Sequence, residues 1–338
     1  MNAPPQNIYL ESYLAVLSPW LERPDLTDIY INRPGELWCE VLSSPPECCI
    51  VPELTGELLA RMVKQIAAVT AQGINREHPL LSASLPDGTR VQAVIPPATR
   101  GEIALAFRKH VSVGLRLEDY RASAAITNTR IIKAEEKSQP SIQEGDDADI
   151  ISMLREAVRS KRNILVSGGT SSGKTTFVNA LLREIPSNER LILIEDTPEL
   201  QVDHQNVVGL IAARGELSEA EVSAADLLIA SLRMRPDRII LGEIRGSEAV
   251  TFLRAVNTGH PGSISTIHAD STGRAIDQLA LLVMETGTQM GWDDVVRYVR
   301  NSLDIIIQLN RADGKRDVGS IMFLDRNSAN LQRRRQVL

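Results

Sequence analysis

Cysteine is scarce in this sequence. Only three of the 338 residues are cysteines, namely Cys39, Cys48 and Cys49. Three cysteines cannot make an even set of disulfides, and their spacing is not that of a metal-binding cluster. We therefore expect structural thiols in a reducing compartment, and no zinc site.

Long hydrophobic runs and an excess of positive charge are also missing. No uninterrupted apolar stretch approaches the roughly 18 residues that a membrane-spanning helix needs, and residues 1–6 lack a basic segment followed by an apolar one. We predict a cytoplasmic protein whose contact with a membrane, if any, is peripheral. The formal net charge of −6 lowers the expectation of nucleic-acid binding but leaves room for a local basic patch.

The composition is otherwise that of a globular protein, with 43% hydrophobic and 24% charged residues, and the length predicts two domains. Residues 1–112 mix helical and strand periodicity, which predicts a small α+β domain. Residues 113–148 are largely polar and charged, so we expect a linker. The expected helices of the first domain are 8–20 and 55–71, and its expected strands are 27–31, 37–42, 80–85, 90–95 and 102–108.

Residues 149–338 alternate between strand and helix patterns, which predicts an α/β domain with a largely parallel sheet covered on both faces. Ligands of such sheets bind at the carboxyl ends of the strands. The expected strands are 163–167, 191–194, 207–211, 239–242 and 264–268, and the expected helices are 151–160, 176–185, 224–234, 247–258 and 272–285.

The clearest motif is GGTSSGKTT at residues 168–176, which matches G-x-x-x-x-G-K-S/T and lies between an expected strand and an expected helix. This context predicts a phosphate-binding loop, in which Lys174 reaches the terminal phosphates and Thr175 ligates magnesium. The residues expected to bind nucleotide here are Gly168, Gly169, Thr170, Ser171, Ser172, Gly173, Lys174, Thr175 and Thr176.

Acidic residues follow two of the expected strands. Glu243 comes directly after 238–242, where an acid can orient magnesium or the attacking water, and Glu195 comes with two further acids after 191–194. Clustered carboxylates repel one another unless a cation compensates, so magnesium is the simplest explanation. His268 ends another expected strand, where its imidazole can contact the terminal phosphate. The sequence alone leaves open which carboxylate is the general base.

Four blocks of the sequence resemble the Walker A, Asp box, Walker B and His box of the type II and type IV secretion ATPases. Within that group, LRMRPDR at residues 232–238 and GHPGSISTIH at 259–268 are similar to the VirB-type traffic ATPases of type IV secretion and conjugation, as is NRPGELWCE at 32–40. The resemblance implies a RecA-like carboxyl domain, a homohexameric ring, and ATP with Mg²⁺ held between the two domains.

The same resemblance implies an ATPase that powers pilus assembly or substrate translocation through nucleotide-driven domain motion. It also implies companion ATPases among its partners, peripheral association with the inner membrane, and no need for nucleic acid. The catalytic residues would be Lys174, Glu195, Glu243, His268 and Arg108. With nucleotide between the domains, Arg108 and Arg90 can place guanidinium groups against its phosphates.

Three alternatives remain open on the sequence alone. A type II-like motor for pilus assembly or retraction shares the superfamily motifs. A RecA-like nucleic-acid translocase would show DNA affinity that falls steeply with salt. A nucleotide-gated scaffold with negligible turnover is disfavoured by the acids beside the loop.

Overall fold

The computed structural model describes residues 6–41, 45–109, 114–134, 141–144, 147–212, 222–312 and 315–324. Two compact units make up the chain. One comprises Met1–Ser112 with Ala213–Ser223, and the other comprises Val113–Ala212 with Ala224–Leu338. Each unit is described by itself.

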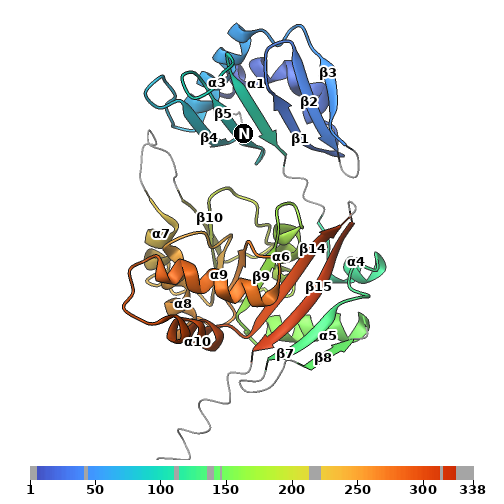
Figure 1. Cartoon of the computed structure of the whole chain (residues 1–338), viewed down its shortest axis with the longest axis vertical. Helices are drawn as coiled ribbons and strands as arrows, with labels where there is room; N and C mark the ends of the chain where they lie inside the picture. Colours follow the sequence, from blue (N-terminus) through green and yellow to red (C-terminus); the bar gives the residue numbers. More distant parts are fainter. Residues whose placement is uncertain are drawn as a thin grey trace, which may run out of the picture. The chain divides into compact units, whose positions relative to one another are not determined.

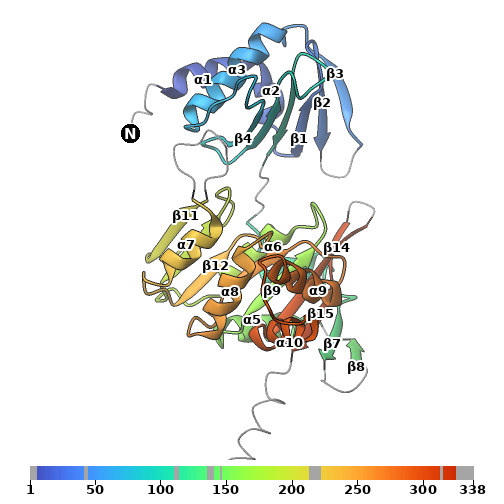
Figure 2. The same ribbon diagram turned by 60° about the vertical axis from the view of Figure 1, so that its left-hand side comes forward.

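The amino-terminal unit is a six-stranded antiparallel sheet with helices on one face (Figures 1 and 2). The strand order is β3-β2-β1-β6-β5-β4. The strands are β1 (Leu26–Ile31), β2 (Glu36–Val41), β3 (Glu47–Ile50), β4 (Leu80–Ser84), β5 (Arg90–Val94) and β6 (Ala104–Arg108). The helices are α1 (Gln6–Leu14), the 3-10 turn η1 (Ala15–Leu17), α2 (Ser18–Leu21) and α3 (Gly56–Val69).

Alternation along the strands builds the core of this unit. Every second residue of β6, including Phe107, is buried against the helices, where Met62 and Ile66 of α3 also lie. Helix α3 begins where the hydroxyl of Thr55 accepts a hydrogen bond from the backbone N–H of Leu58 at 3.2 Å. The predicted α+β arrangement of this unit is therefore confirmed.

The carboxyl unit contains a nine-stranded sheet in the order β11-β10-β12-β13-β9-β14-β15-β7-β8. Neighbours from β11 to β14 are all parallel. The strands are β7 (Arg130–Ala134), β8 (Ser141–Glu144), β9 (Ile164–Gly168), β10 (Leu191–Glu195), β11 (Val207–Ile211), β12 (Arg238–Leu241), β13 (Ile264–Ile267), β14 (Ile305–Ala312) and β15 (Lys315–Leu324).

Helices cover both faces of this sheet (Figures 1 and 2). Helices α7 to α10 pack on one face around Phe252 and Leu279, whereas α4 to α6 pack on the other around Leu154 and Phe177. Because both faces are covered, strands such as β10 are buried along their whole length. The helices are α4 (Leu117–Ala122), α5 (Asp147–Arg159), α6 (Lys174–Leu182), α7 (Ala224–Ser231), α8 (Glu248–Asn257), α9 (Thr272–Met284) and α10 (Trp292–Ser302).

The interval 113–148 differs from the expected linker. It contains α4, β7 and β8, and β7 pairs in parallel with β15 while β8 pairs with β7. Leu117 and Ile126 are fully buried, and the ring of Tyr120 meets Phe177 edge-on at 5.0 Å. These residues belong to the fold of the carboxyl unit. Residues 135–140, 145 and 146, within the most polar part of the interval, lie outside the described residues.

Three elements at the carboxyl end of the chain were not predicted. Helix α10 packs against α8 and α9, and β14 and β15 form an antiparallel hairpin. Strand β14 also pairs in parallel with β9, the strand that leads into the phosphate loop. The hairpin therefore adjoins the loop directly.

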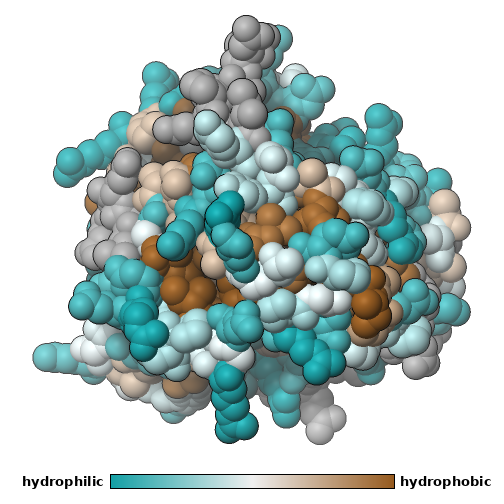
Figure 3. Space-filling view, turned by 90° about the horizontal axis from the view of Figure 1, so that it is seen from above, coloured by the Kyte–Doolittle hydropathy of each residue, from teal (hydrophilic) through white to brown (hydrophobic). Residues whose placement is uncertain are grey.

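The surface of the described chain is mixed. Figure 3 shows one face of the molecule, on which hydrophobic residues gather in small patches bordered by hydrophilic ones. Within the described part of the chain, no helix is both long and apolar enough to span a membrane. The large hydrophobic residues that are exposed are Tyr9, Ile50, Leu80, Ile211, Ile229, Leu281, Met290 and Trp292.

Candidate active site

The phosphate loop joins β9 to α6, as predicted. Gly173 caps α6 with φ of +91°, and Ser171 also has a positive φ of +59°. A Cβ on Gly168 would lie 2.9 Å from the carbonyl oxygen of Leu309, so a larger residue does not fit there. The loop thus needs glycine both for its backbone angles and for its close approach to β14.

Lys174 and His268 come together beside this loop. The ammonium of Lys174 donates hydrogen bonds to the carbonyl oxygens of Gly168 at 2.8 Å and Gly169 at 3.2 Å. Both ring nitrogens of His268, which follows β13, lie 3.3 Å from the same ammonium nitrogen. The structure therefore places His268 within reach of the lysine that the sequence predicts to bind terminal phosphates.

Glu195 and Thr175 are linked through Glu199. The carboxylate of Glu195 is buried and accepts hydrogen bonds from the backbone N–H groups of Glu199 and Leu200, each at 2.7 Å. The hydroxyl of Thr175 donates to Glu199 Oε2 at 2.9 Å. Glu195 therefore shapes the loop after β10, and Glu199 is the carboxylate of that loop that contacts the phosphate-loop threonine.

Glu243 lies between Arg245 and His268. One carboxylate oxygen accepts a hydrogen bond from Arg245, which also lies 3.4 Å from Asp196 Oδ2. This hydrogen bond and the Glu243 charge raise the pKa of the Arg245 guanidinium. Nε2 of His268 lies 2.8 Å from the other oxygen, Oε1, although the two atoms form no hydrogen bond. The buried Oε1 atom thus has no hydrogen-bond donor among the described residues.

The side chains of Glu243, Arg245, His268 and Gln278 line a cavity of about 190 Å³. Its apolar wall comes from the strand end and from α9. The cavity lies at the carboxyl edge of the parallel sheet, where β12 and β13 end. The cavity therefore has room for small polar groups beside Glu243 and His268, the two lining residues that were predicted to take part in catalysis.

The oxygen donors beside the phosphate loop fit a magnesium ion that is coordinated mainly by the phosphates of a nucleotide. Within the described ranges, no group of three or more His, Cys, Asp and Glu side chains is placed to hold a metal ion. A magnesium ion bound with nucleotide needs only one or two protein oxygens, because phosphates and water complete its shell. The Thr175 hydroxyl and the unbonded Glu243 Oε1 are oxygen donors of that kind.

Arg90 and Arg108 lie in the amino-terminal unit. They are directly opposite one another on β5 and β6, and Asp28 of β1 is opposite Arg108 on the other side. Residues that face one another across a ladder point to the same face of the sheet. The structure therefore brings the two arginines together, beside an acid that the sequence did not indicate.

Of two further site residues, Glu199 was predicted only as one of three clustered acids, and Arg316 was not predicted. Glu199 stands in the acidic cluster after β10, and only its contact with Thr175 distinguishes it from its neighbours. Arg316 of β15 donates a hydrogen bond from Nε to the carbonyl oxygen of Ser171 at 3.0 Å. No local motif marks Arg316, because its partner lies 145 residues away.

The family model for "Type II/IV secretion system protein" matches residues 17–334. This chain belongs to the type II/IV secretion system protein family. The match includes most of the amino-terminal unit as well as the carboxyl unit. The four motif blocks therefore lie in a chain that resembles this family over nearly its whole length.

Individual relatives agree with the family. VirB11 of the Brucella suis type IV secretion system is 39% identical over 308 residues, covering 88% of this chain and 84% of VirB11. VirB11 of Bartonella quintana is 36% identical over 326 residues, covering 92% of this chain and 91% of that protein. The solved structure of the pilus retraction motor PilT with bound ADP has a TM-score of 0.60 at 19% identity, covering 97% of this chain and 86% of PilT. The predicted RecA-like, two-domain fold is confirmed.

Proposed function

We propose that this family member is an ATPase that powers pilus assembly or substrate translocation by a type IV secretion system. The observation that supports this most directly is the contact of Lys174 with His268, which in turn lies 2.8 Å from Glu243. The cation of the phosphate loop, a partly buried acid and an imidazole thus meet at the ends of neighbouring strands. The VirB11 relatives, named as type IV secretion proteins, indicate the machine in which this site operates.

Each side chain of the site has a role in hydrolysis. Lys174 binds the terminal phosphates and stabilises charge that develops on them during transfer. Glu243 orients the attacking water or accepts its proton. His268 contacts the terminal phosphate and responds to its loss.

Thr175 and Glu243 are the residues that we place in contact with Mg²⁺, and Glu195 supports them through the Glu199 loop. Bound magnesium supplies positive charge against the phosphate oxygens. In the described structure the Thr175 hydroxyl is held by the Glu199 carboxylate at 2.9 Å. Glu199 thereby fixes the orientation of this hydroxyl before nucleotide binds.

The amino-terminal unit contributes Arg108 and Arg90 to the same nucleotide in this proposal. Two permanently charged guanidinium groups on adjacent strands match the charge of a triphosphate. ATP then stabilises a closed arrangement of the domains, and loss of the terminal phosphate releases it. Repeated around a homohexameric ring, this cycle delivers force to the secretion machine.

The proposed partners are further copies of this chain, companion ATPases and other type IV secretion components. The site of action is the cytoplasmic face of the inner membrane, to which the ring binds peripherally. Nucleic acid is not required for turnover. These assignments rest on family membership.

The decisive experiment measures ATP turnover and molar mass together, with and without double-stranded DNA. We expect turnover that is unchanged by DNA, in particles of six times the chain mass of 37.1 kDa. Lys174→Ala serves as the control without activity. An unaltered chain without ATP turnover would overturn the proposal, and turnover that depends on DNA would point to a nucleic-acid translocase instead.

A further inference from the structure

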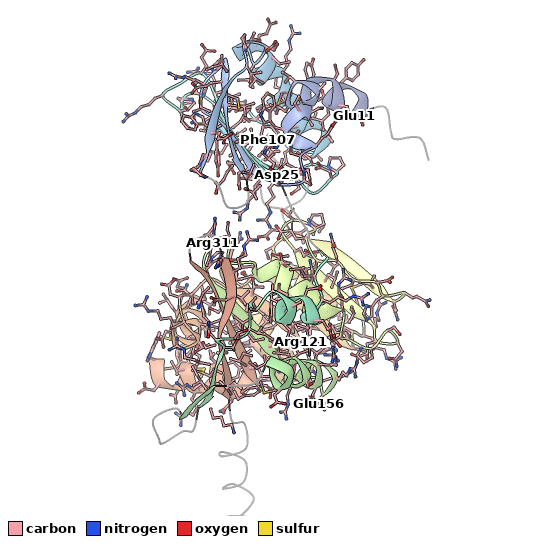
Figure 4. The ribbon with its side chains drawn as sticks, turned by 90° about the vertical axis from the view of Figure 1, so that its right-hand side faces the viewer. Glu11, Asp25, Phe107, Arg121, Glu156 and Arg311 are labelled. Atoms are coloured by element: carbon pink, nitrogen blue, oxygen red, sulfur yellow. The ribbon has the colours of Figure 1, made fainter. Side chains whose placement is uncertain are left out.

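The β14–β15 hairpin lies beside the phosphate loop. Leu309 of β14 is in register with Gly168, the first residue of the loop, so the hairpin continues past the point where β9 ends. Figure 4 shows Arg311 at the end of β14, and Arg311 is directly opposite Arg316 of β15. The end of the hairpin is thus placed to contact the loop from the side.

Arg316 makes the first of two contacts between the hairpin and the site. Its Nε donates to the carbonyl oxygen of Ser171 at 3.0 Å, and its Cδ would lie 3.4 Å from a Cβ on Gly173. In a planar trans peptide the C=O and the next N–H point in opposite directions. The N–H of Ser172 accordingly points into the loop, toward the carbonyl oxygen of Gly169 at 3.3 Å. Arg316 thereby fixes the orientation of the Ser171–Ser172 peptide in the phosphate loop.

Gln308 makes the second contact. Its side-chain amide donates to the carbonyl oxygen of Ala269 at 3.2 Å, and the hydroxyl of Ser167 lies 3.3 Å from the same oxygen. Ala269 directly follows His268. Gln308 is only 5% exposed, and its Oε1 is buried with no hydrogen-bond donor among the described residues. An apolar residue at this position would avoid the free-energy cost of burying an amide oxygen without a hydrogen bond. The amide of Gln308 therefore has a role beyond packing.

The hairpin is itself firmly held. Its two strands pair from Ile305 to Ala312. In addition, both the backbone N–H and the backbone carbonyl of Val318 in β15 form hydrogen bonds outside the hairpin. The N–H of Val318 donates to Ala125 O at 2.8 Å, and its carbonyl oxygen accepts from the Thr129 hydroxyl at 2.7 Å. A rigid strand can impose a position on the loops that contact it.

We propose that the β14–β15 hairpin is the positioning element of the nucleotide site, with Arg316 setting the phosphate loop and Gln308 setting His268. The inference rests on the proposed ATPase function and extends it to residues that carry no motif. Neither residue is assigned contact with the reacting atoms. Each acts through the loop that it holds, so the two have different kinetic signatures.

The Arg316 contact is tested by nucleotide affinity in the full-length protein. We expect Arg316→Ala to weaken ATP and ADP binding about three- to tenfold and to raise KM in parallel, while kcat changes less than twofold. Arg316→Lys should recover part of the affinity. The matched control is Lys315→Ala, which removes the same charge from the neighbouring position on the opposite face of β15. Equal affinities for Arg316→Ala and Lys315→Ala would overturn this part of the proposal.

The Gln308 contact is tested by a double-mutant cycle with His268. Gln308→Met keeps the side-chain length but removes the donor to Ala269, so we expect kcat to fall about tenfold with nucleotide affinity unchanged. In a His268→Ala background the same substitution should have no further effect, because the group that it positions is gone. Ser320→Ala, at the position opposite Gln308 on β15, is the control and should match the unaltered protein.

Two results would overturn the role of Gln308. One is a kcat of Gln308→Met equal to that of the unaltered protein, and the other is independent, multiplying effects of Gln308→Met and His268→Ala. Failure of the proposed function looks different, because the unaltered protein itself would then hydrolyse no ATP. In that case the affinity measurements on Arg316 would still decide whether the hairpin positions the phosphate loop.

Discussion

Arg238 provides a sharp test of what holds the carboxyl unit together. This arginine begins β12 and is fully buried. Its Nε and Nη2 donate to the two carboxylate oxygens of Glu189 at 2.7 and 3.0 Å, and its Nη1 donates to the carbonyl oxygen of Val158 at 2.7 Å. One side chain thus joins the starts of β12 and β10 to the end of α5.

Arg238→Met removes this cation and leaves three acceptor oxygens without it, two on Glu189 and one on Val158. Glu189 is only 8% exposed, so its carboxylate loses its main partner where water hardly reaches it. Breaking a buried pair in this way costs about 3 to 5 kcal/mol. With a denaturant slope of about 2.5 kcal/mol per molar for a unit of this size, the urea midpoint should fall by about 1 to 2 M.

The stability lost in Arg238→Met should become smaller as the pH falls. Burial acts to raise the pKa of Glu189, but the hydrogen bond and charge of Arg238, together with Lys161, outweigh it, so its pKa lies below the ordinary value. A depressed carboxyl pKa stabilises the fold above the unfolded pKa of about 4.3, and this contribution is lost as pH falls through the folded value. The difference between the unaltered protein and Arg238→Met should therefore be full at pH 7 and shrink below about pH 4.

The assay is urea unfolding of the full-length protein, followed by circular dichroism at pH 7 and again in acid. Arg274→Met is the matched control, because Arg274 forms an exposed pair with Asp270 and should change stability by less than about 0.5 kcal/mol. Glu189→Leu combined with Arg238→Met removes both charges and should restore most of the loss. A midpoint for Arg238→Met within error of the Arg274→Met midpoint would refute the reasoning.

Three further predictions concern turnover. Lys174→Ala should abolish ATP hydrolysis with the fold intact, because the terminal phosphates lose a contact worth roughly 1.5 to 3 kcal/mol in the ground state alone. A hydrolysis rate within a few-fold of that of the unaltered protein would show that this loop is not part of the active site. Glu243→Gln should bind ATP but cleave it slowly, and Glu195→Gln should behave similarly, so unimpaired single-turnover cleavage in both variants would contradict their roles. Arg108→Ala should lower both turnover and nucleotide affinity, as measured by steady-state kinetics and calorimetry, and values equal to those of the unaltered protein would show that this arginine takes no part.

Much of the fold was readable because it depends on short-range order. The β1–β2 and β4–β5 hairpins follow from alternating residues around tight turns, with Gly35 and Gly88 both at positive φ. The succession of strands and helices along the chain from β9 to β13 follows from apolar runs that alternate with amphipathic helices. The phosphate loop is the strongest case, since all its requirements lie within nine residues.

The interval 113–148 and the carboxyl end show where local reading fails. Polar residues around position 140 suggested a linker, yet β7 pairs with β15, some 190 residues further along the chain. No local pattern encodes such a partner. The same holds for β14, whose place beside β9 is set by a parallel pairing across more than 130 residues.

The sequence by itself determined the kind of chemistry, because a phosphate loop is specified by residue types at fixed spacing. It also predicted that acids and a histidine would follow strands of the same sheet. Only the tertiary structure decided which of them meet: Lys174 with His268, Thr175 with Glu199, and Arg316 with Ser171. Those contacts join segments 24 to 145 residues apart, and they form because the parallel sheet gathers its strand ends at one edge, which no single segment of the chain encodes.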